Sequence, residues 1–140
     1  MSAAHVRHEL RTPLNAIIGY SEMILDDVVG NLDATALLTK ILATADSMLK
    51  TIDLVSEHLN SSCVQPRGEV LAQLLLRIDA DRETVAGCLA GLRVGNGMDG
   101  AINDDLDAIE KACGKLGVLT SRWQPGITVI ESYINLAISA

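Results

Sequence analysis

The sequence predicts an all-α protein, and three observations support this prediction. Hydrophobic residues make up 49% of the 140 residues, but aromatic residues only 2%, with no phenylalanine. An aliphatic core suits packed helices better than a sandwich or barrel, whose strands favour aromatic and β-branched residues. The apolar residues also recur in alternating steps of three and four, the spacing of one face of a helix. A chain of this length can bury about two-thirds of its unfolded surface, so a real core is available.

The first helix is expected between His5 and Val28. Its apolar face is a heptad stripe with one polar member: Leu10, Leu14, Ile17, Ser21, Ile24 and Val28. Gly30 and Asn31 end the pattern, and Asp33 is the expected N-cap of the following helix.

The second helix is expected from about Ala34 to Leu59. Its apolar stripe follows the same steps: Leu38, Ile41, Ala45, Met48, Ile52, Val55 and Leu59. Because only a few residues join the two helices, they must lie antiparallel as a hairpin. Ile18, Leu42 and Leu49 widen the apolar arc beyond what one partner helix covers. We expect a second copy to complete a four-helix bundle as a homodimer; alternatively, the C-terminal half of the same chain supplies the other two helices.

The hairpin is expected to form a first domain at residues 1–62, with a linker at 63–66, because Pro66 stops a continuous helix. Residues 67–140 are expected to be a helical region of unknown role. A helical pattern restarts there: Val70, Leu71, Leu74, Leu75, Ile78, Val85, Leu89 and Leu92. The charged patch at 79–83 either lies on the outer face of this helix or breaks it.

A turn at 95–97 precedes a further apolar stripe: Ile102, Leu106, Ile109, Cys113 and Leu116. Pro125 and Gly126 are expected to interrupt the chain again, and residues 127–138 form either a last helix or a strand.

Charge and cysteine content exclude several classes of protein. Eighteen acidic and eleven basic residues give a net charge of −7, which argues against a nucleic-acid or anionic-membrane surface. No run approaches the ~18 consecutive apolar residues that a membrane span needs. The N-terminus has no apolar export signal, and the three cysteines form no C-x-x-C pair. We therefore expect a reduced, cytoplasmic chain.

The first helix carries the residues that could take part in a chemical reaction. A helix advances about 100° per residue, so His8 lies roughly 200° from Leu10 and faces water. It belongs to a polar stripe: His8, Thr12, Asn15, Gly19, Glu22 and Asp26. A solvated imidazole is a good nucleophile near pH 7, and the neighbouring Glu9 can orient or polarise it. Pro13 frees a carbonyl about one turn earlier and allows a kink. From these residues alone, an ordinary surface histidine beside an incidental proline is the competing interpretation.

The string His8-Glu9-Leu10-Arg11-Thr12-Pro13-Leu14, followed by Asn15-Ala16-Ile17-Ile18-Gly19-Tyr20, resembles the H-box of two-component sensor histidine kinases. More narrowly, residues 1–62 resemble the dimerisation and histidine-phosphotransfer (HisKA-type) domain. The resemblance implies a helical hairpin that dimerises into a four-helix bundle and passes a phosphoryl group to or from an aspartate of a response-regulator receiver.

The resemblance also implies roles for individual residues. His8 would be the phosphoacceptor, Glu9 the acidic residue that assists proton removal, and Thr12 the residue that helps to place a hydrolytic water. Arg7 and Arg11, with His5, form a small positive cluster that we expect to meet the acidic pocket of the receiver, together with Asn15. The rate of phosphoryl transfer would then depend on the salt concentration, because salt screens this attraction.

The chain departs from a full kinase after residue 62. The Asn-containing and Gly-rich boxes of an ATP-binding domain are missing there, and Gly95, Gly97 and Gly100 lack the basic residue of a nucleotide loop. We expect no cofactor in this chain, with ATP and Mg²⁺ bound by a separate kinase domain or, for Mg²⁺, by the receiver. The chain is then part of a sensor kinase or a phosphotransferase, and not an autonomous kinase. The alternative is a scaffold that keeps the H-box but is never phosphorylated.

Four further predictions concern other reactive residues. His5 and His8, with Glu9, could chelate a metal at i, i+3 spacing, but a site needs a third protein ligand and a fixed geometry, so no metal site is expected. His58 is expected to be a surface histidine, Cys88 and Cys113 to be core thiols, and Trp123 to be a packing anchor.

Overall fold

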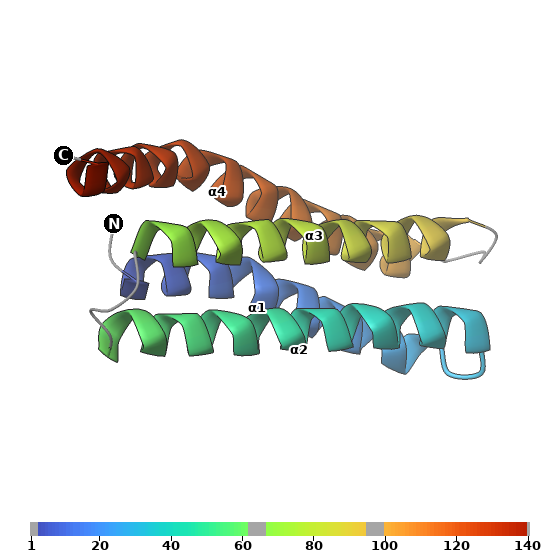
Figure 1. The fold of residues 1–140 in the computed structure, drawn as a ribbon. Coiled ribbons are helices and arrows are strands. Elements are labelled where there is room, and N and C mark those ends of the chain that lie inside the picture. Colours follow the sequence, from blue (N-terminus) through green and yellow to red (C-terminus); the bar gives the residue numbers. More distant parts are fainter. Residues whose placement is uncertain (1–2, 62–66, 95–99, 140) are drawn as a thin grey trace.

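Four α-helices make up the part of the chain that the computed structural model describes (Figure 1). The backbone is described for residues 3–61, 67–94 and 100–139, and the side chains for residues 4–57, 69–94 and 100–122. The helices are α1 (Ala3–Asp27), α2 (Leu32–Ser61), α3 (Arg67–Arg93) and α4 (Gly100–Ser139). The described ranges contain no strand, which confirms the all-α prediction. The linker expected at 63–66 and the turn at 95–97 lie outside the described residues.

A tight turn joins α1 to α2 and makes them antiparallel. Gly30 adopts a φ of 96°, in the left-handed region that glycine enters without steric cost. The N–H of Asn31 donates to the Val28 carbonyl at 2.9 Å, and its side-chain oxygen accepts from the N–H of Ala34 at 3.1 Å. Asn31 is therefore the N-cap of α2, and the prediction of Asp33 was wrong. Asp33 instead lies in the first turn of α2, where its charge favours the helix dipole.

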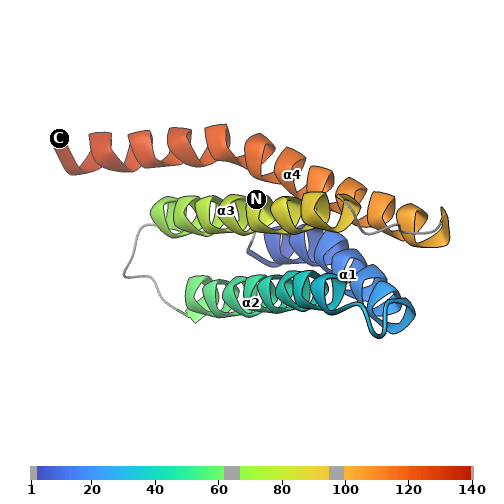
Figure 2. The same ribbon diagram turned by 90° about the vertical axis from the view of Figure 1, so that its right-hand side faces the viewer.

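The four helices close a bundle within one chain. Each helix packs against two others: α1 against α2 and α4, and α3 against α2 and α4. Figure 2 shows the α1–α2 hairpin beside the α3–α4 hairpin, with the C-terminal part of α4 extending past the N-terminal end of α3. This is the second of the two arrangements that the sequence left open. Homodimerisation itself stays a prediction, because the structure is that of a single chain.

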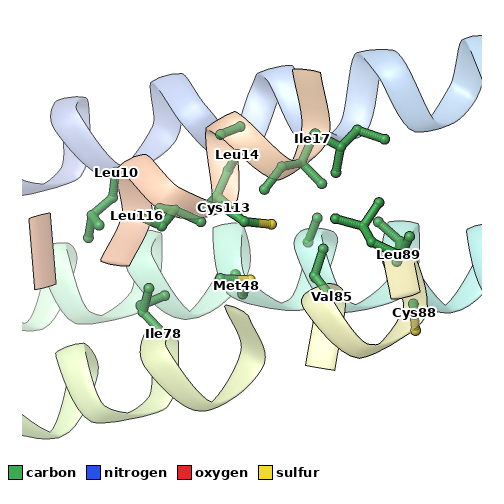
Figure 3. Close-up of a cluster of buried hydrophobic side chains, with 14 of the residues drawn as sticks. Leu10, Leu14, Ile17, Met48, Ile78, Val85, Cys88, Leu89, Cys113 and Leu116 are labelled. Carbon is green, nitrogen blue, oxygen red and sulfur yellow. The ribbon is translucent and has the colours of Figure 1, made fainter. Parts of the chain in front are cut away.

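One apolar cluster fills the space between the four helices. Figure 3 shows Leu10 and Leu14 of α1 meeting Met48 of α2, Ile78 of α3 and Cys113 of α4. Every residue of the stripe predicted for the first helix is buried, including Ser21 with 0% exposure. The stripes predicted in α3 and α4 are also buried, apart from Val70, which is half-buried at its edge.

The charged patch at 79–83 does not break α3, which runs through it. Arg82 is half-buried, and its guanidinium donates twice to Asp79 Oδ1, at 2.8 and 3.0 Å. Its stem and Nε lie against Gly117 of α4, where an added Cβ would approach Nε to 3.3 Å. The absent side chain of Gly117 therefore makes room for Arg82 between the two helices.

The last helix continues where an interruption was expected. α4 spans 40 residues from Gly100 to Ser139, so the predicted break at Pro125 was wrong. Of the two alternatives for residues 127–138, the structure has the helix. The side chain of Trp123 lies outside the described residues.

Candidate functional site

A solvent-exposed polar stripe runs along α1 on the side opposite its buried face. All six residues predicted for this stripe are exposed: His8, Thr12, Asn15, Gly19, Glu22 and Asp26. On the other side of the same helix, Leu10, Leu14 and Ile17 have no exposed surface. The packing of α1 onto the bundle thus holds the imidazole of His8 in solvent, accessible to a second molecule.

A proline lies within α1, five residues after His8, and does not interrupt the helix. Pro13 is buried inside α1, and the helix is continuous from Ala3 to Asp27. Since proline has no N–H, the carbonyl of Glu9 loses its helical donor. The hydroxyl of Thr12 donates to the carbonyl of His8 at 3.3 Å. Thr12 is therefore anchored on the same face as His8, one helical turn further along.

Two arginines beside His8 share one carboxylate. Arg11 Nη1 donates to Asp53 Oδ1 at 2.7 Å, and Arg7 Nε lies 3.3 Å from the same oxygen. Asp53 belongs to α2, so these pairs join the turn of His8 to the second helix. All three side chains keep between 35% and 49% of their surface exposed, which leaves the guanidinium groups accessible to water. The predicted positive cluster is therefore partly neutralised.

Sequence reasoning missed Asp53, although a signal for it was present. In an antiparallel hairpin, residues equally far from the turn lie at the same level. Asp53 lies about as far after Gly30 and Asn31 as His8 lies before them. It also directly follows Ile52, which is buried in the seam. Counting from the turn would have placed this acid beside Arg7 and Arg11.

The structure does not join Glu9 to His8. Glu9 is half-buried and lies about 100° around the helix from His8. Among the described side chains, its carboxylate makes no hydrogen bond or ion pair with the His8 ring. Asn15 lies in the exposed stripe two turns after His8. Of the predicted site residues, the structure thus brings together Arg7 with Arg11, and Thr12 with the backbone of His8.

The exposed histidine, the buried proline after it and the hairpin that holds them agree with one known family. Residues 2–57 match the family model of the His Kinase A (phospho-acceptor) domain. We call this stretch the HisKA segment. The match confirms the resemblance carried by the H-box and covers α1 and most of α2. Neither a curated protein nor a solved structure matches the chain.

HisKA domains contain the phosphoacceptor of two-component systems, and they dimerise and work with kinase and receiver domains. The HisKA segment has His8 and Thr12 on its solvent side, and Arg7 and Arg11 of α1 pair with Asp53 of α2 at the contact between the two helices. The helices α3 and α4 lie outside the matched residues, but they cover the apolar side of the segment. Among the described helices, none has a stretch long and apolar enough to cross a membrane.

The other candidate residues occupy less reactive positions. Cys88 and Cys113 are buried free thiols, as predicted. Burial raises the pKa of Cys113 to about 11, with a smaller opposing effect of the positive charge of Arg82. Within the described residues no group of three or more metal-ligating side chains occurs. The side chain of His58 lies outside the described residues.

Proposed function

We propose that this chain is a histidine phosphotransfer module, in which His8 carries a phosphoryl group to or from the aspartate of a response-regulator receiver. The observation that supports the proposal most strongly is that the phosphoacceptor segment of the family has its histidine in solvent. A buried histidine could not reach a phosphorylated partner.

The proposed reaction with a phosphorylated receiver is a displacement at phosphorus. A ring nitrogen of His8 attacks, an N–P bond forms, the P–O bond to the receiver aspartate breaks, and the aspartate leaves as a carboxylate. After its attack the His8 ring holds one proton in excess, and Glu9 is the carboxylate next to it in the chain. In the reverse direction the receiver aspartate attacks phosphorus, and the imidazole leaves. We assign to Thr12 the placement of a water that hydrolyses the phosphoryl group.

The proposal also assigns partners. The receiver docks against the exposed stripe of α1, with Asn15 on its footprint and Arg7 and Arg11 facing its acidic pocket. The receiver binds its own Mg²⁺, and ATP is bound by a separate kinase domain that charges His8. We assign no cofactor to residues 1–140. A homodimer of two HisKA segments is the family's usual assembly, and the closed single-chain bundle is the other arrangement.

Transfer of label from a phosphorylated receiver tests the proposal. The protein should acquire a label that is stable in base and lost in acid, as expected for a phosphoramidate. The label should disappear in His8→Ala and persist in His5→Ala, a matched control because His5 is also exposed and lies on the same helix. Thr12→Ala should keep the label for longer. Failure to label the wild type with several receivers would leave the scaffold as the function.

A further inference from the structure

The apolar face of the HisKA segment is already covered by the rest of the chain. In α1 the seam residues Leu10, Leu14 and Ile17 are 0% exposed, and α4 packs on this helix. In α2 the seam residues Ile41 and Met48 are equally buried, and α3 packs on that helix. The two hairpins therefore use the same faces that two copies of a hairpin would use to form a bundle.

The apolar side chains that remain exposed on the HisKA segment do not form a second seam. In its described residues the large exposed ones are Met23, Val29, Leu32 and Leu54. Val29 and Leu32 lie at the α1–α2 turn, and Met23 and Leu54 lie on different helices. Only Val29 and Leu32 are three residues apart, and the turn at Gly30 and Asn31 lies between them, so the four do not form the repeating steps of three and four that a further helix would need. A second copy could bury the seam only by displacing α3 and α4.

The contact between the hairpins is closely fitted. Leu37 of α2 points at Gly91 of α3, where an added Cβ would lie 3.1 Å from Leu37 Cδ1 and 3.6 Å from Cδ2. The missing side chain at Gly91 leaves the space that Leu37 occupies. Glycine inside a helix costs about 1 kcal/mol relative to alanine. Gly91 therefore lowers the stability of α3 but allows α3 to approach α2 closely.

The covalent connection favours the intrachain arrangement further. Only residues 62–66 separate the described ends of α2 and α3. A short tether gives an effective concentration in the mM range, so the attached hairpin outcompetes a second copy at ordinary protein concentrations.

We propose that the α3–α4 hairpin replaces the second HisKA copy, so that the chain acts as a monomer with one phosphoacceptor per bundle. All three histidines of the chain precede residue 62, so the second hairpin has no histidine of its own. A bundle of two HisKA copies would hold two acceptors, whereas this bundle holds one and binds one receiver. The statement about the acceptor rests on the proposed function; the statement about the hairpin does not.

A disulfide between the hairpins tests the arrangement. In the full chain with Cys63→Ser, the pair Leu37→Cys and Gly91→Cys places two thiols at the fitted contact, and removal of Leu37 also removes the atoms that would crowd a side chain at 91. Mild oxidation should produce a cross-linked chain that migrates as a monomer under denaturing, non-reducing conditions. The two variants that carry only one of the introduced cysteines are the controls, and circular dichroism verifies that each variant is helical. A cross-linked dimer formed by the pair would overturn the proposal.

Light scattering of the wild type tests the monomer separately. The mass should stay near the 14.9 kDa of one chain. It should do so up to a protein concentration of about 0.1 mM, below the effective concentration of the tether. A mass of about two chains would overturn the monomer. The number of receivers bound to each particle tests the single acceptor. One receiver on a particle of one chain would support it, and two receivers per particle would contradict it. If no label transfers while the cross-link stays within one chain, the proposed function fails and the hairpin replacement stands.

Discussion

The Asp53 carboxylate accepts a 2.7 Å hydrogen bond from the Arg11 guanidinium across the α1–α2 interface. Arg11 lies one turn after His8, and the same carboxylate also pairs with Arg7, directly before His8. An acid of the chain's own second helix therefore competes with any acidic partner for these two arginines. Because the pairs are partly exposed, water and salt weaken them, and the competition is mild.

Asp53→Asn should strengthen the attraction between this site and an acidic receiver. The substitution removes the internal competitor and makes the face more positive, so the rate of association should rise severalfold in low salt. Stability should fall by less than about 1 kcal/mol. Transfer rates measured between about 20 and about 500 mM salt should converge with those of the wild type as screening increases. Asp104→Asn, an equal charge change at an exposed position on α4, is the control. A transfer rate that does not change with salt in either protein would contradict the docking surface.

Ser21→Ala should stabilise the protein. Ser21 is fully buried in the seam of α1, and among the described residues its hydroxyl has no hydrogen-bond partner. Removal of an unsatisfied buried hydroxyl should raise the free energy of unfolding in urea by about 1 kcal/mol. Ser47→Ala, at an exposed position of α2, measures the gain from helix propensity alone. Equal gains in the two variants would show that burial of the Ser21 hydroxyl costs nothing.

Two glycine substitutions should have opposite effects. Gly114 lies exposed in α4, with no atom within 4 Å of an added Cβ, so Gly114→Ala should stabilise by about 1 kcal/mol through helix propensity. Gly30 has a φ of 96°, so Gly30→Ala should destabilise by about 1 kcal/mol through backbone strain. Urea unfolding of both variants measures the difference. Stabilisation by Gly30→Ala would show that the turn does not need a left-handed residue.

The buried thiol of Cys113 should make stability fall at alkaline pH. Burial raises its pKa from 9.0 to about 11, so between these values the folded chain keeps a proton that the unfolded chain releases. This contribution is complete below pH 9 and is lost as the pH rises towards 11, with a slope of up to about 1.4 kcal/mol per pH unit. Cys113→Ala should unfold with a shallower dependence over the same interval. Identical curves would contradict the raised pKa.

Much of the fold follows from spacing in the sequence. The alternating steps of three and four predicted which face of each helix is buried, and hence that His8 faces water. The same spacing cannot say what covers a buried face, which is why the sequence left a second copy and the C-terminal half as alternatives. Spacing also left open whether the charged patch at 79–83 breaks α3. The helix continues there, and Arg82 packs against Gly117 of α4.

Local signals were less reliable than periodicity. Asn31 and Asp33 are both good N-cap residues, and only the turn at Gly30 selects between them. A proline predicts a helix end, yet α1 runs through Pro13 and α4 runs through Pro125. At the site, the helical spacing predicted the exposed residues, but Asp53 could be placed there only once both helices were paired across the turn.

Locating the phosphoryl group tests the central claim most directly. After incubation with a phosphorylated receiver, the protein is digested and its peptides are sequenced by mass spectrometry without exposure to acid. We predict a single added phosphoryl group, on the imidazole of His8. A phosphoryl group on His5, on His58 or on a hydroxyl side chain, with His8 unmodified, would contradict the account.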